Sequence, residues 1–74
     1  MNLEEAPIKK ELEIVSISEE KLSELALRFG IDAGEQIFIV NKLPGGPIVI
    51  QKKEQQIAIG RELAKEIKVK ITNS

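Results

Sequence analysis

The 74-residue sequence lacks the side chains on which most enzymes and metal sites depend. It has no cysteine, histidine, tryptophan or tyrosine and only two phenylalanines. Without cysteine there are no disulfides or thiolate zinc sites, and without histidine the commonest general base is missing. No apolar run approaches the roughly 18 residues of a membrane-spanning helix, and no signal-peptide pattern is present. The composition therefore predicts a cytosolic protein that is not an enzyme, binds no cofactor and does not insert into a membrane.

The positive and negative charges of the chain nearly cancel. Lys and Arg number 11 against 12 for Asp and Glu, which gives a net charge of -1. Such a balance provides no overall field to attract nucleic acid or an anionic membrane. The lysines also lack the stacking aromatics that single-strand binders use. We expect no nucleic-acid partner, and a nucleic-acid-binding small barrel remains only a third interpretation.

Residues 18–35 predict one short helix that ends in a glycine turn. Apolar residues recur at i, i+3, i+4 and i+7, which gathers them on one helix face: Leu22, Leu25, Ala26 and Phe29. Ser18 is placed to cap the start of the helix through its side chain, and Gly30 to end it in the left-handed conformation. Leu27 lies about 140° from Leu22 on the helical wheel, off the apolar face. We expect Leu27 to be exposed.

The rest of the chain predicts five short strands. Alternating or continuous apolar patterns place them at residues 8–17, 35–42, 48–50, 56–59 and 67–71. The four consecutive apolar residues 37–40 predict burial of both faces, which assigns Phe38 to the core. A loop rich in proline and glycine at 43–47 follows the second strand, and a charged turn near Lys53 follows the third. Residues 61–66 are long enough for one helical turn.

Five strands and one helix in 74 residues predict a single domain over residues 1–74. We expect an all-β fold with one short helix, a small SH3-like five-stranded antiparallel barrel. A β-sandwich usually needs about seven strands and nearer 100 residues. With both phenylalanines assigned to the core, no aromatic-lined groove for proline-rich peptides is expected.

Four segments follow one another in an order that matches a known family. They are Leu3 with Ala6-Pro7 ahead of the first strand, residues 27–34, the loop 43–48, and a closing segment that contains Arg61. Together these segments resemble the ferrous iron transport protein A (FeoA) family. The sequence departs from the family pattern at three backbone or packing positions: Lys9 or Lys10 in place of an early glycine, Phe29 in place of leucine, and Ala33 in place of proline.

The resemblance implies a small cytosolic, non-enzymatic accessory protein of bacterial ferrous iron uptake. Its implied partner is the cytoplasmic GTPase domain of a ferrous iron permease. The same fold type closes some iron-dependent repressors as a C-terminal domain, so a metal-ion-binding or metal-sensing domain is the alternative interpretation. A chain that starts at Met1 favours the free-standing version.

Leftover apolar residues are better candidates for binding than the charged ones. Glu19, Glu20 and Glu24 span one helical turn, but Fe²⁺ prefers imidazole together with carboxylate, and acidic residues here complement the helix dipole. We therefore expect no metal site. Leu27 and Leu43 do not fit the core, and two prolines frame the loop beside Leu43. We predict that four residues contact the partner: Leu27, Leu43, Pro44 and Pro47.

Overall fold

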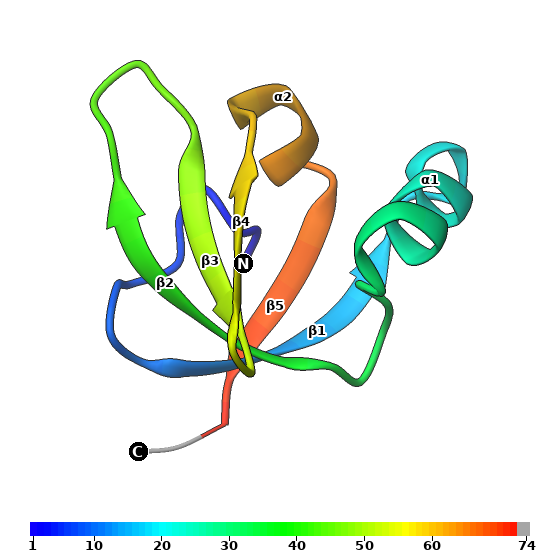
Figure 1. Ribbon diagram of the computed structural model, residues 1–74, viewed down its shortest axis with the longest axis horizontal. Helices are drawn as coiled ribbons and strands as arrows, with labels where there is room; N and C mark the ends of the chain where they lie inside the picture. The colour runs from blue at the N-terminus through cyan, green and yellow to red at the C-terminus, as the bar shows by residue number, and fades with distance from the viewer. Residues whose placement is uncertain (73–74) are drawn as a thin grey trace.

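A computed structural model describes residues 1–72 of the chain, apart from the side chains of Leu22 and Ser23. In this part of the chain five strands form one sheet in the order β4-β3-β2-β1-β5, with every neighbouring pair antiparallel. The strands are β1 (Glu11–Ile17), β2 (Gln36–Lys42), β3 (Ile48–Lys52), β4 (Gln55–Ile59) and β5 (Ile67–Ile71). Helix α1 (Glu19–Phe29) lies between β1 and β2, and the short α2 (Arg61–Ala64) precedes β5 (Figure 1). This confirms the predicted element order.

The first ten residues belong to no strand or helix, yet they close one side of the core. The N–H of Leu3 donates to the carbonyl oxygen of Ile67 at 2.8 Å, and the N–H of Val69 donates to that of Met1 at 2.8 Å. Leu3 and Ala6 are fully buried. The predicted start of the first strand at residue 8 is wrong, because a turn with Lys9 at φ 62° delays the strand to Glu11.

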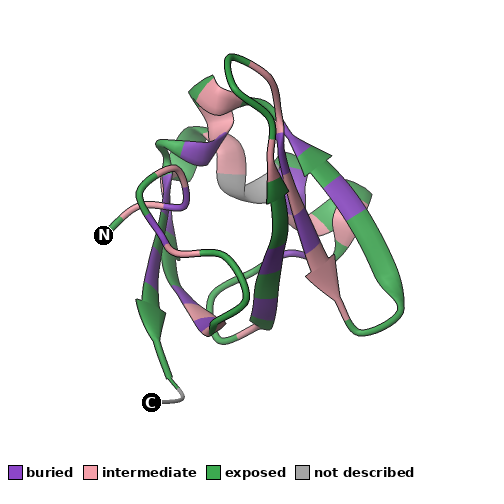
Figure 2. Ribbon diagram, turned by 90° about the vertical axis from the view of Figure 1, so that its left-hand side faces the viewer, coloured by how far each residue is buried: buried purple, intermediate pink, exposed green. Residues whose placement is uncertain are grey.

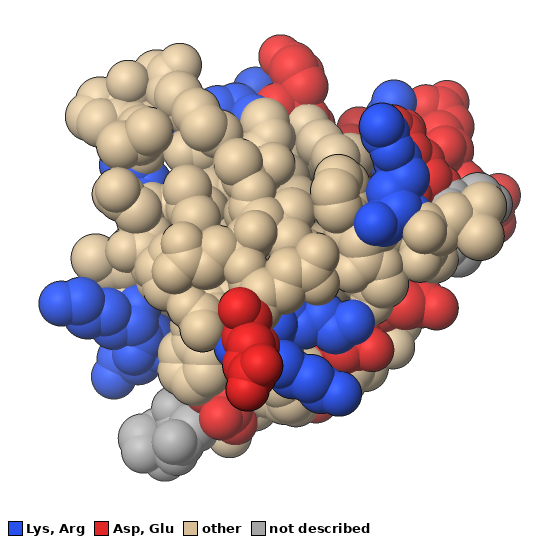
Figure 3. Space-filling view, viewed as in Figure 1, with Lys and Arg blue, Asp and Glu red and all other residues tan. Residues whose placement is uncertain are grey.

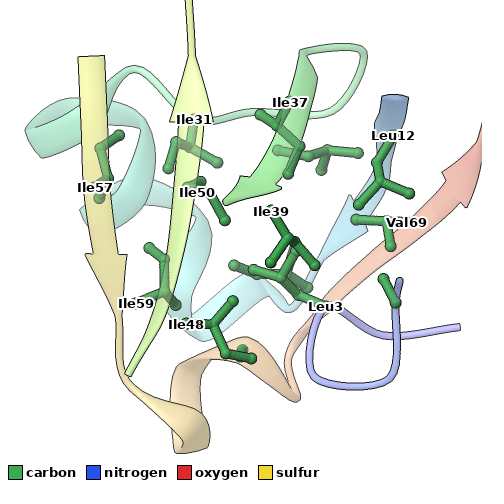
Figure 4. Packing of buried hydrophobic residues seen from close by; sticks show 14 of the residues in the cluster. Leu3, Leu12, Ile31, Ile37, Ile39, Ile48, Ile50, Ile57, Ile59 and Val69 are labelled. Carbon is green, nitrogen blue, oxygen red and sulfur yellow. The ribbon is translucent and has the colours of Figure 1, made fainter. Parts of the chain in front are cut away.

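Aliphatic side chains fill the space inside the curved sheet. Figure 4 shows isoleucines of β2, β3 and β4 pointing towards Leu3, Leu12 and Val69. Helix α1 contributes the fully buried Leu25, and Ile31 follows directly after the helix. Phe29 is only partly buried at the edge of this cluster. The predicted core position of Leu22 lies outside the described side chains.

Irregular register in two strands explains apolar residues that break the period of two. The pairing of β1 with β5 shifts between Ile14 and Ser16. This bulge allows Ile14 and Ile17, three residues apart, to face the same core, while Val15 between them is 49% exposed. A second shift lies in β2 between Ile39 and Asn41.

The prediction that residues 37–40 are all buried is wrong. Ile37 and Ile39 are fully buried, but Phe38 is 41% exposed and Val40 38% exposed. Figure 2 shows buried and exposed residues alternating along the strands. The reason is that one face of β2 packs on the core, whereas neither helix of residues 1–72 covers the other (Figure 1).

The two ends of α1 behave differently from each other. Gly30 has φ 66° and ends the helix as predicted, and Lys52 Nζ lies 2.6 Å from its carbonyl oxygen. The predicted side-chain cap at Ser18 is wrong: its Oγ is buried and makes no hydrogen bond within the described residues. The backbone N–H of Ser18 instead donates to the carbonyl oxygen of Glu66 at 3.2 Å. Neither helix described here combines the length and the apolar character needed to cross a membrane.

Candidate functional site

The interior of the described chain offers no group for acid–base or metal chemistry. All of its buried residues are hydrophobic. Within residues 1–72 no three carboxylates come together in a way that would hold a metal ion. The three ion pairs among these residues lie at or near the surface. The candidate functional residues are therefore those exposed on the surface.

Leu27 stands on the outside of α1 and is 85% exposed, as the helical wheel predicts. Beside it Arg28 and Glu24 form an exposed ion pair at 3.3 Å, one turn apart on the same helix. An exposed leucine next to charged residues has little to contribute to folding. Its role in binding stays a prediction.

The loop that carries Leu43 is an ordered turn. The N–H of Gly46 donates to the carbonyl oxygen of Leu43 at 2.8 Å, which closes a four-residue β-turn. Pro44 occupies the second position and Gly45, with φ 69°, the third. Proline followed by a residue with positive φ is typical of a type II turn, so glycine is needed at position 45. Leu43 is 44% exposed at the base of this turn.

Arg61 of α2 holds the loop in place. Its Nε donates to the carbonyl oxygen of Gly46 and one terminal nitrogen donates to that of Leu43, both at 2.8 Å. The other terminal nitrogen lies 3.7 Å from a carboxylate oxygen of Glu4. Sequence reasoning placed Arg61 in a family pattern but missed this contact. The residue type could have indicated such a contact, because the planar guanidinium of arginine can donate to several acceptors at once.

Replacing Arg61 with alanine is expected to loosen the loop and to lower the free energy of unfolding by about 1–2 kcal/mol, because two charge-assisted hydrogen bonds in a partly exposed site are lost. Urea denaturation measures the loss, and amide exchange at Gly46 reports the loop. Arg61→Lys is the matched control, since it keeps the charge but not the fork of donors. If alanine leaves both measurements at their wild-type values, the arginine does not order the loop.

The structure brings together three of the four predicted contact residues, since Leu43, Pro44 and Pro47 share one loop. Leu27 does not join them. In Figure 1 α1 lies at the right of the molecule, and the loop between β2 and β3 rises at the upper left. A partner that touches both must therefore reach across the molecule, which is 28 Å along its longest axis.

A shallow groove over β2 is the surface feature that sequence reasoning missed. It has a volume of about 480 Å³ and an apolar floor that includes Phe38 and Val40. Lys9 and Lys53 stand at its margins. Buried and exposed residues alternate along β2. Because residues 37–40 are all apolar, the sequence did not reveal this alternation. The expectation that both phenylalanines lie in the core is thus wrong for Phe38.

Comparisons with known proteins agree with this fold. The model of the FeoA domain matches residues 1–71. The NMR structure of a FeoA-like protein from Clostridium acetobutylicum is 28% identical, with a TM-score of 0.83 over 100% of this chain and 88% of that chain. The crystal structure of an iron uptake regulatory protein (FeoA) is 26% identical, with a TM-score of 0.78 over 93% of this chain and 92% of that one.

A third structure supports the barrel type. Stenotrophomonas maltophilia FeoA complexed with zinc, described as a procaryotic SH3 domain protein, is 24% identical, with a TM-score of 0.75 over 95% of this chain and 89% of that chain. The predicted SH3-like fold is thereby confirmed. The search of curated proteins gave no match. Because the family model covers nearly the whole sequence, this chain belongs to the FeoA domain family.

Proposed function

We propose that this protein is a non-enzymatic accessory component of ferrous iron uptake that works by binding the cytoplasmic GTPase domain of a ferrous iron permease. The observation that carries the proposal is the match of residues 1–71 to the FeoA domain, a family without known catalytic activity. The molecule's own chemistry agrees with it, since the described residues leave several large apolar side chains exposed.

The proposed contact uses Leu27 and the loop of Leu43, Pro44 and Pro47. Interfaces take much of their binding energy from a few side chains that lose contact with water. Leu27 is available for this because it is 85% exposed. Leu43 is available because the type II turn and Arg61 fix its backbone before any partner arrives, which reduces the entropy lost on binding.

The test measures binding of the purified protein to the purified GTPase domain of the permease from the same organism, by calorimetry. Leu27→Asp and Leu43→Asp are each expected to weaken binding by about tenfold or more, the effect of losing a contact worth about 1.4 kcal/mol. Val15→Asp is the control, because Val15 is an exposed aliphatic residue on β1 that is not one of the proposed contact residues.

Two results would contradict the proposal in different ways. If the wild-type protein does not bind the GTPase domain under any nucleotide condition, the proposed partner is wrong. If it binds and both aspartate variants bind equally well, the partner is right and the contact residues are wrong.

A further inference from the structure

The outer face of β2, β3 and β4 carries no charge, although 31% of the residues of the chain are charged. Side chains alternate along these strands, so the residues between the buried isoleucines point outward. They are Gln36, Phe38, Val40, Val49, Gln51, Gln56 and Ala58. Figure 3 shows a broad uncharged surface in the middle of the molecule, with basic side chains at its left margin and both acidic and basic side chains at its lower margin. The groove over Phe38 lies on this face.

The face is held in shape by its own hydrogen bonds. Gln56 Nε2 donates to Gln51 Oε1 at 3.2 Å, and Gln51 Nε2 donates to the carbonyl oxygen of Lys53 at 2.9 Å. At the other margin the N–H of Lys9 donates to the carbonyl oxygen of Ile39 at 3.0 Å. The backbones that carry the two lysines are therefore tied to the strands that form the groove.

Lys9 and Lys53 also share an unusual backbone conformation. Their φ values are 62° and 55°, and within the described chain they are the only residues other than glycine with positive φ. Lys53 is the first residue of a two-residue hairpin turn between the paired Lys52 and Gln55, a position where glycine is favoured. Side chains at such positions cost strain energy and concentrate at functional sites. The strain is thus placed where two cations border an apolar groove.

These two lysines are free to bind a partner's anions. The ion pairs of residues 1–72 use Arg28, Lys52 and Arg61 as their cations, and neither Lys9 nor Lys53. Carboxylates occur next to Lys53 in the hairpin turn, at the exposed Glu54, and on β1, where Glu11 pairs in register with Phe38 and Glu13 with Gln36. None of these three lines the groove. Glu11 and Glu13 each lie 3.4 Å from a neutral partner, Thr72 Oγ1 for Glu11 and Gln36 Nε2 for Glu13.

We infer that this groove binds an acidic, apolar segment of the partner protein, with an apolar side chain on Phe38 and Val40 and carboxylates on Lys9 and Lys53. The inference rests on the proposed function as a protein-binding module and adds a second contact surface to it. The groove's volume of about 480 Å³ suits a few side chains of a peptide segment. Charge complementarity selects an acidic segment over a basic one.

Two synthetic dodecapeptides provide the probe, one with leucine alternating with glutamate and one with leucine alternating with lysine. Each is titrated into the ¹⁵N-labelled protein. The acidic peptide is expected to shift the amide signals of Phe38, Val40, Gln51 and Lys53, and the basic peptide is not. Binding should weaken as salt is raised, because the lysines are exposed. Equal binding of both peptides, or shifts confined to α1, would overturn the inference.

Amino-acid substitutions distinguish specific binding in the groove from nonspecific binding to apolar surface. Phe38→Ala is expected to weaken binding of the acidic peptide about tenfold, whereas Ile71→Ala, at 43% exposure a match for Phe38 at 41%, leaves it unchanged. The double variant Lys9→Gly with Lys53→Gly is expected to lose at least about fivefold in affinity with no fall in melting temperature, because glycine relieves the strain. Lys10→Ala removes a charge next to Lys9 and serves as its control. An unaltered affinity in the double variant would overturn the role of the lysines.

The GTPase domain of the permease then distinguishes this inference from the proposed function. If the acidic peptide binds in the groove but the GTPase domain does not bind at all, the groove is a binding site and the proposed partner is wrong. If the GTPase domain binds the wild-type protein and the Phe38→Ala variant equally well, the proposed function is supported and the inferred role of the groove is wrong. If the same amide shifts appear when the protein alone is concentrated, the occupant is a second copy of the chain and the inference is wrong.

Discussion

Leu25→Asp is expected to unfold the protein. Leu25 is fully buried where α1 meets the core. Removing a buried leucine side chain costs about 2–5 kcal/mol, and placing an unpaired carboxylate in an apolar interior adds several more. A domain of this length has a total stability of about 4–11 kcal/mol at the usual ~0.05–0.15 kcal/mol per residue. Circular dichroism and the dispersion of amide signals should therefore report a largely unfolded chain at 25 °C.

The matched control is Leu27→Asp, two residues further along the same helix. At 85% exposure Leu27 contributes little to the core, so the change should cost no more than about 1 kcal/mol, from helix propensity and an acid near the helix C-terminus. If Leu27→Asp unfolds the protein, Leu27 is needed for folding and cannot be reserved for a partner. If Leu25→Asp remains folded, α1 does not anchor the core.

The second large effect is expected at Leu3, in the segment outside the strands and helices. Leu3→Ala should lower the free energy of unfolding by about 2–5 kcal/mol, because Leu3 is fully buried and its backbone pairs with β5. Thermal and urea denaturation would show the loss as a lower midpoint with an unchanged native spectrum.

Ile8→Ala provides the comparison within the same segment, since Ile8 is 46% exposed. Its effect should stay within about 0.5–1 kcal/mol. Equal losses for both variants would mean that the segment packs loosely, and that the burial of Leu3 is not what attaches it to the core.

Local patterns in the sequence were enough to predict most of the elements of the fold. The change from a period of two to 3.6 and back identified α1 between β1 and β2, and glycine at position 30 identified the end of the helix. These features depend on interactions between residues close together in the chain, so a short stretch of sequence is enough to predict them. The same holds for the exposure of Leu27, which follows from helical geometry alone.

The hydrophobic pattern gave a wrong prediction of burial at β2, where burial depends on which part of the fold packs against each face of the strand. Residues 37–40 are all apolar, and apolar composition does not tell whether a strand has one covered face or two. In this fold one face of β2 packs on the core and the other meets solvent, so Phe38 and Val40 form a groove instead of core. The turn at Lys9, which shortens β1, is another feature that the apolar pattern did not reveal.

By itself the sequence determined the elements, their order, the small barrel and the absence of histidine, cysteine, tyrosine and tryptophan, because composition and short-range periodicity are local properties. Only the tertiary structure decided that Leu3 completes the core, that Arg61 secures the loop of Leu43, and that Leu27 lies apart from that loop. Tertiary structure also placed Lys9 and Lys53 beside Phe38. Each of these relations joins residues far apart in the chain, and it is the register of the strands and the curl of the sheet that set which of them meet.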